Sequence, residues 1–114
     1  MSSIFLAHSV SLTAKALELK AKLEAAGHKV ELPIDPLNLT ELSILQGNAF
    51  LIGRCDVVFA LWSGMSDGCY GDVCMAIALG RKVYVEYPNL HMRRAWALFS
   101  ELKTIDSWDV RREV

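Results

Sequence analysis

The stretch from Asp56 to Gly80 limits the fold more than any other part of this chain. It opens with the run Asp56–Trp62, which is apolar after its first residue, and such a run predicts a strand buried in a parallel sheet. A loop rich in serine and glycine follows at 63–68, and apolar residues at helical spacing resume from Val73. A buried strand, a glycine-containing loop and a helix N-terminus form the small-molecule site of many open α/β sheets.

Short apolar segments alternate with amphipathic ones along the whole chain. Strands are predicted at 4–7, 28–32, 56–62, 82–87 and 104–108. Strands that alternate with helices build a parallel sheet covered on both faces, so we expect a three-layer α/β fold. The prediction is a Rossmann-like or flavodoxin-like parallel sheet of four to five strands, with the strand at 56–62 in its centre. At this length, residues 1–114 are expected to form a single domain.

Apolar residues that recur every three or four positions predict the helices. The first is expected to be capped by Ser9 or Ser11 and to end at Gly27, with a stripe of Leu12, Ala16, Leu19, Leu23 and Ala26. A capping box of Asn38 and Glu41 is expected to open the second, whose apolar face is Leu42, Leu45, Ala49 and Ile52. A last helix is predicted from Pro88-Asn89, with Met92, Trp96 and Phe99.

Composition excludes several classes of function. The 114 residues are 53% hydrophobic and carry a formal net charge of −1, which gives no reason to expect a nucleic acid or a membrane surface as partner. The chain has neither a signal-peptide pattern at its start nor an apolar run of transmembrane length. Its 3 cysteines lack the spacing of a zinc site and are typical of reduced thiols in the cytosol. We therefore expect a cytoplasmic protein without a metal or cofactor.

Ligands of open parallel sheets bind beyond the carboxyl ends of the strands. The polar or aromatic positions at that rim are predicted to be His8, Ser9, Trp62, the loop 63–68 and Pro88-Asn89. Asp72 is expected in the first turns of the helix after the loop, where the helix dipole favours an ionised carboxylate. A carboxylate at the mouth of a cleft can act as a nucleophile or a base.

The segment Asp56–Ala60, the loop Ser66-Asp67-Gly68 and the segment Asp72–Val83 resemble the nucleoside 2-deoxyribosyltransferase family. This family includes the 2′-deoxynucleoside 5′-phosphate N-hydrolases. Its pattern is an Asp-Gly-Thr-like loop, a Glu, and an Ala-rich helix that ends in Gly-Lys-Pro-Val. The resemblance implies an enzyme that breaks an N-glycosidic bond, as a hydrolase or as a base-exchange transferase.

The resemblance also assigns roles to individual residues. Asp72 matches the nucleophilic Glu of the family, with the charge kept and one methylene lost. Asn48 matches a second catalytic residue that is usually Asp, and an amide there can hold a sugar hydroxyl but cannot accept a proton as a base. His8 stands where the family has a Gly after the first strand, and Cys74 where it has a Gly two residues after the nucleophile.

Two further matches concern the substrate. Ser66 and Gly68 correspond to the loop with which the N-hydrolases bind a 5′-phosphate, and Arg93 lies near in sequence. Asn89 corresponds to a transferase Asn that reaches the 5′-hydroxyl from the neighbouring subunit. We favour a nucleotide over a nucleoside because backbone N–H groups at a helix start suit a phosphate. The resemblance and the apolar helix after Asn89 predict a homodimer, since aromatic, Met and Arg residues are enriched in interfaces.

Other interpretations stay open. The segment Ile4–Ser9 and the helix after it also resemble the start of a TIR domain, which would imply a signalling adaptor or an NAD-cleaving enzyme. The sequence Cys69-Tyr70-Gly71-Asp72 is similar to the lead of the TIR catalytic helix. A catalytically inactive nucleotide-binding protein is the third alternative. Asp72 could also be a simple first-turn acid, Ser66 a turn residue, and Trp62 a packing residue rather than a platform for a base.

Overall fold

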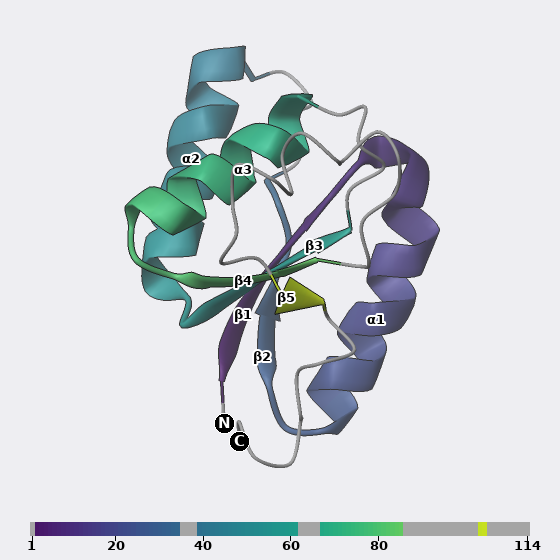
Figure 1. Ribbon diagram of the computed structural model, residues 1–114. Coiled ribbons are helices and arrows are strands. Elements are labelled where there is room, and N and C mark those ends of the chain that lie inside the picture. Colours follow the sequence, from purple (N-terminus) through teal and green to yellow (C-terminus); the bar gives the residue numbers. More distant parts are fainter. Residues whose placement is uncertain (1, 35–38, 62–66, 86–102, 105–114) are drawn as a thin grey trace.

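The computed structural model describes residues 2–34, 39–61, 67–85 and 103–104 of the chain (Figure 1). The elements in chain order are β1 (Ser3–His8), a short 3₁₀ turn η1 (Val10–Leu12), α1 (Thr13–Ala25), β2 (Lys29–Glu31), α2 (Glu41–Arg54), β3 (Val57–Leu61), α3 (Asp67–Ala78), β4 (Lys82–Val85) and β5 (Lys103–Thr104). Strands and helices alternate as predicted. Trp62, Ser66, the segment from Tyr87 to Phe99 and most of the strand predicted at 104–108 lie outside the described residues.

The sheet is parallel and has 5 strands in the order β2-β1-β3-β4-β5. This is the flavodoxin-like order, in which the chain reverses direction across the sheet between β1 and β3. The pairing of these two strands runs from Ile4 opposite Val57 to His8 opposite Leu61, so both strands end at the same level. The predicted α/β fold and the central position of the strand at 56–62 are confirmed.

Two apolar layers hold the sheet between its helices (Figure 1). On one face, α1 packs against a cluster that alternates along each strand: Ile4, Leu6, Ala16, Leu23, Val30, Val57, Phe59, Leu61 and Tyr84. On the other face, α2 and α3 pack against a second cluster: Phe5, Ala7, Ile52, Cys55, Val58, Ala60, Cys69, Val73, Ala76, Val83 and Val85. All residues of β3 are buried, as expected of a central strand with helices on both sides.

The start of α1 differs from the prediction. Ser9 precedes η1 and makes no side-chain capping hydrogen bond, and the α-helix proper begins at Thr13. The hydroxyl of Thr13 donates to the carbonyl of Val10 over 2.7 Å. The expectation that Ser9 or Ser11 caps this helix is therefore wrong, because a 3₁₀ turn satisfies part of the helix start. Gly27 ends the helix as predicted, with a positive φ of 97° that favours glycine.

The predicted apolar face of α2 is confirmed only in its second half. Ile52 is buried and Ala49 is half-buried, whereas Leu42 is 62% exposed and Leu45 is also exposed. The other buried residue of the helix is Asn48, because it makes a polar contact with α3 that an apolar pattern cannot register.

The start of α2 also differs from the prediction. The N-cap is Thr40 and not Asn38, and the hydroxyl of Thr40 accepts from the backbone N–H of Ser43 over 3.1 Å.

Candidate active site

The carboxyl ends of β1 and β3 mark the place where a ligand is expected. His8 pairs with Leu61 at the last position of both strands, and the backbone N–H of Ser9 donates to the carbonyl of Leu61 over 3.0 Å. The chain leaves β1 toward α1 and leaves β3 toward α3, on the opposite face. Such a divergence of two neighbouring strands opens the crevice in which flavodoxin-like folds bind their ligands.

Asp72 lies on the inner face of α3. The buried residues of this helix are Cys69, Asp72, Val73 and Ala76, which is the spacing of a single helical stripe. The side chain of Asp72 is only 5% exposed, although the residue is charged in water. A carboxylate that only favoured the helix dipole would stay in solvent within the first turn. Its burial in the second turn is not what a simple first-turn acid would show, and its role in a site stays a prediction.

Asn48 approaches Asp72 from α2. Asn48 is also 5% exposed, and its side chain hydrogen-bonds to the carboxyl of Asp72. On its other side, its Oδ1 accepts the backbone N–H of Ile34, which follows β2, over 2.9 Å. The two residues predicted to be catalytic thus meet in the interface between the two helices.

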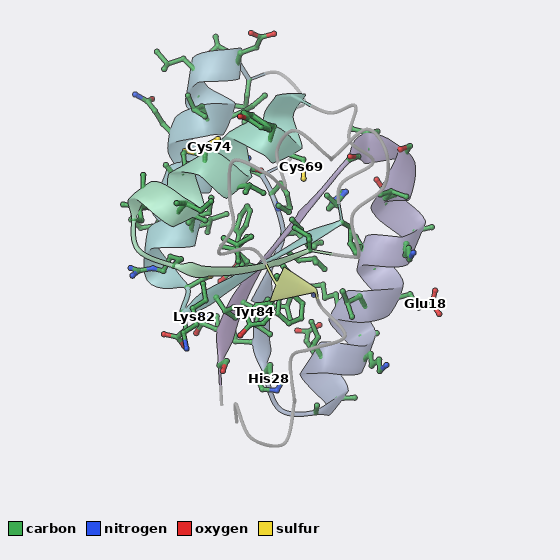
Figure 2. All side chains as sticks on the ribbon, viewed as in Figure 1. Glu18, His28, Cys69, Cys74, Lys82 and Tyr84 are labelled. Atoms are coloured by element: carbon green, nitrogen blue, oxygen red, sulfur yellow. The ribbon has the colours of Figure 1, made fainter. Side chains whose placement is uncertain are left out.

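Burial sets the proton affinity of Asp72. Desolvation raises the pKa of this carboxyl from 3.8 to about 7, and the hydrogen bond from Asn48 opposes that rise. Near neutral pH both protonation states are therefore populated. Cys69 lies one turn before Asp72 on α3 (Figure 2), and burial together with the charge of Asp72 raises the pKa of its thiol. Cys69 is consequently an uncharged neighbour, and the site can ionise without a thiolate beside it.

The other predicted site residues are distributed as follows. Ser9 is buried just beyond β1, and Gly68 is exposed in the first turn of α3. His8 is half-buried, and its Nδ1 lies 3.0 Å from the carbonyl oxygen of Ser9. The alternation of β1 places His8 on the face of Leu6 and α1, which is opposite to the face that α3 covers. Substrate binding by these residues stays a prediction, and Trp62, Ser66, Asn89 and Arg93 lie outside the described residues.

The structure adds Ile34 and Gly47, which sequence reasoning missed. Gly47 packs on Ile34, because a Cβ at position 47 would lie 2.5 Å from Cδ1 of Ile34. A glycine inside a helical pattern is a signal of such a close approach. The partner could not be predicted, because the contact depends on the path of the chain between β2 and α2. Across the described ranges, no group of three or more His, Cys, Asp or Glu residues is placed to hold a metal ion.

The fold and the site together define an α/β domain of flavodoxin-like strand order with a buried carboxyl group on the helix that follows the central strand. Solved structures with this fold include the CMP N-glycosidase BcmB of Clostridium botulinum, with a TM-score of 0.64 and 21% identity over 90% of this chain and 87% of that chain. A 2-deoxyribosyltransferase from Leishmania mexicana is also similar, with a TM-score of 0.61 and 18% identity over 82% of this chain and 71% of that chain.

These likenesses confirm the fold that the resemblance to nucleoside 2-deoxyribosyltransferases implied. At such identities they concern the arrangement of the backbone. No protein-family model matches the sequence, and no curated protein matches it. No helix among the described residues has the length and apolar character needed to cross a membrane.

Proposed function

We propose that this protein breaks the N-glycosidic bond of a nucleoside or a nucleoside 5′-monophosphate, as a hydrolase or as a base-exchange transferase. The observation that carries the proposal is the buried Asp72 on α3, the helix after the central strand, with the hydrogen bond that it receives from Asn48 of α2. The names of the two similar structures support it, since one is a CMP N-glycosidase and the other a 2-deoxyribosyltransferase.

Asp72 acts as the nucleophile in this proposal. Its ionised carboxylate attacks the anomeric carbon of the sugar, a new C–O bond forms, and the bonding electrons of the C–N bond leave with the base. The transition state has the oxocarbenium character of glycoside hydrolysis, in which a carboxylate stabilises the positive charge that develops. Water then attacks the anomeric carbon, and the C–O bond to Asp72 breaks. The proton that the water loses goes to the departed base and balances its charge. A second base in place of water gives transfer.

The raised pKa of Asp72 suits this role in one respect. A buried carboxylate is poorly solvated, and a positive charge that develops on the sugar replaces the missing solvation. The attraction is therefore stronger in the transition state than in the neutral ground state, which is the condition for catalysis. The same argument requires that the group be ionised before attack, so turnover rises with pH through about 7.

The substrate contacts are proposed from the resemblance. Ser66, Gly68 and Arg93 bind a 5′-phosphate, while Ser9 and Trp62 line the sugar and base. His8 would have to reach the substrate from the α1 side of the sheet, opposite to Asp72. Asn89 reaches the site of a second subunit in a homodimer. Light scattering tests the dimer, and a monomer that retains full activity would contradict it.

Release of free base tests the function. The protein is incubated separately with CMP, dCMP, the other ribo- and deoxynucleoside monophosphates, the matching nucleosides and NAD, and the products are separated by chromatography. Free base from a monophosphate or a nucleoside is the expected result. Nicotinamide from NAD alone would favour the TIR-like alternative and contradict the proposal. Binding of a nucleotide without any cleavage would identify a catalytically inactive binding protein.

A further inference from the structure

The amide of Asn48 is held from two directions by groups of opposite hydrogen-bonding character. The backbone N–H of Ile34 is a donor, and it uses Oδ1 of Asn48 as its acceptor over 2.9 Å. The ionised carboxyl of Asp72 is only an acceptor, so it takes its hydrogen bond from the amide NH₂ group of Asn48. An asparagine can serve both partners at once only in one of its two flip states.

We propose that Asn48 is a positioning residue whose orientation is fixed by the backbone N–H of Ile34, so that its NH₂ group holds the Asp72 carboxylate in place for attack. The segment that follows β2 thereby becomes part of the catalytic apparatus without touching the substrate. The role of Asn48 in attack rests on the proposed function. The arrangement of its hydrogen bonds rests on the contacts of Asn48 with Ile34 and Asp72 alone.

The packing of α2 brings Asn48 close to the backbone N–H of Ile34. Gly47 precedes Asn48 and faces Ile34, whose Cδ1 lies only 2.5 Å from the place that a Cβ at position 47 would take. Since glycine has no side chain, the helix can approach the segment after β2 closely at this point. The approach places the backbone N–H of Ile34 beside the amide and keeps the pair of Asn48 and Asp72 away from solvent.

An aspartate, the usual family residue at this position, would satisfy only one of the two partners. In its ionised form, its carboxylate could still accept the N–H of Ile34 but would have no hydrogen to donate to Asp72. Two buried carboxyl groups in contact would also repel each other when ionised, and one pKa would rise strongly. The amide therefore has a specific purpose at position 48, which is to favour the ionised state of Asp72 in a buried place.

Other titratable groups lie on α3 and on the elements that pack against it. The titratable or charged residues on α3 and on the described elements packed against it are Asp67, Cys69, Tyr70 and Cys74 on α3, Glu41 and Arg54 on α2, His8 on β1, and Lys82 and Tyr84 on β4. The pKa of Asp72 is governed by burial first and by the Asn48 hydrogen bond second. Asn48 is thus the group whose change should move that pKa in a known direction.

A matched pair of variants tests the inference. Ile34→Pro removes the backbone N–H, while Ile34→Ala trims the side chain to a similar degree and keeps the N–H. The pKa of Asp72 is followed by carboxyl ¹³C NMR, with the signal assigned by its loss in Asp72→Asn. We expect Ile34→Ala to resemble the wild type. Ile34→Pro should raise the pKa by about one unit, because the hydrogen bond that lowers it is no longer held.

A second variant guards against a failure of Ile34→Pro to fold. Asn48→Leu is similar in size, adds no charge and removes the donor to Asp72, so it should also shift the pKa of Asp72 upward. In the active enzyme, the acid limb of the kcat profile should move to higher pH by the same amount, with KM little changed. An unchanged acid limb and an unchanged carboxyl titration in Asn48→Leu would overturn the inference, as would equal titrations in the two Ile34 variants.

The NMR titration needs no turnover, and this separates the inference from the proposed function. If no substrate is cleaved but the carboxyl titration responds to Ile34→Pro and Asn48→Leu, the hydrogen-bond arrangement is supported and the proposed function fails. If base is released but neither the titration nor the pH profile responds, the function stands and the positioning role is wrong.

Discussion

The two faces of the sheet bury different kinds of side chain, although the same strands build both. The face under α1 is built from aliphatic and aromatic side chains, with Phe59 and Tyr84 in an edge-to-face contact at 5.7 Å between ring centroids. The face under α2 and α3 has a comparable apolar cluster but also buries Asn48 and Asp72 where the helices meet. One face is organised for stability, and the other accepts a buried carboxyl group.

The difference shows where this protein tolerates an energetic cost. Burial of a carboxyl group is unfavourable unless the group is neutral or well hydrogen-bonded. The raised pKa of Asp72 records that cost, and the hydrogen bond from Asn48 offsets part of it. A purely apolar pair at these positions would pack without such a penalty. The energetic cost of the polar pair is one reason for proposing a functional role for it.

The largest effect is expected from Asp72→Asn, which keeps the shape of the side chain and removes its charge. We expect turnover to fall about a thousandfold or more, because the nucleophile is lost while the fold is kept. Base release under saturating substrate measures the effect, and circular dichroism checks the fold. Turnover within about threefold of the wild type would show that Asp72 is not the nucleophile.

A substitution on the face under α1 should lower stability and leave turnover nearly unchanged. Phe59→Ala leaves a cavity under α1, and we expect the free energy of unfolding to fall by about 3–5 kcal/mol. The kcat per folded molecule should change little, because Phe59 lies on the face away from Asp72. Urea unfolding and active-site titration measure the two quantities. A loss of kcat as large as that of Asp72→Asn, without a loss of stability, would remove the distinction between the faces.

Asp72 should also make stability depend on pH. Its pKa is raised from 3.8 in the unfolded chain to about 7 in the fold, so below about pH 4 the group is protonated in both states and has no effect. Between pH 4 and 7 the unfolded chain binds fewer protons, and the free energy of unfolding falls as pH rises.

Asp72→Asn removes the contribution of this carboxyl group to the pH dependence of the free energy of unfolding. At about 1.4 kcal/mol per pKa unit, the variant should be more stable than the wild type by a few kcal/mol at pH 8 and equal to it near pH 3.5. Urea unfolding at the two pH values measures the difference. A variant that is less stable than the wild type at pH 8 would indicate that the carboxylate is well stabilised in the fold.

The smallest effect is expected at the start of α2. Thr40→Ala removes the hydroxyl that accepts from Ser43 N–H and should lower stability by about 1 kcal/mol. Thr13→Ala is the matched control, because the exposed hydroxyl of Thr13 donates to a carbonyl and does not cap a helix start. A loss at Thr40 no greater than the loss at Thr13 would show that the cap is unimportant.

Much of the fold could be predicted from the sequence because the strands have strong local signals. The apolar run before Trp62 predicted a central strand, and β3 is buried throughout. The spacing of Val73 and Ala76 placed Asp72 on a helix, and its resemblance to a nucleophile position pointed to the carboxyl group. These signals come from residues that are close together in the chain, so they can be recognised in a single sequence.

The orientation of α2 could not be predicted in the same way. The apolar pattern favoured the face of Leu42 and Leu45, and both side chains are exposed. The true face is selected by Asn48, which gains partners only when Asp72 and the backbone of Ile34 are in place. A polar residue that is buried through contacts distant in sequence has the same local signature as one in solvent.

Trapping of the glycosyl intermediate would show whether the Asp72 carboxylate attacks the sugar. In a substrate with fluorine at the 2′ position, the fluorine destabilises the positive charge at the anomeric carbon and slows breakdown of the covalent intermediate. We predict a sugar adduct on the peptide that contains Asp72, found by mass spectrometry in the wild type and absent in Asp72→Asn. Release of base together with an adduct on another residue, or with the same adduct in the variant, would show that Asp72 is not the nucleophile.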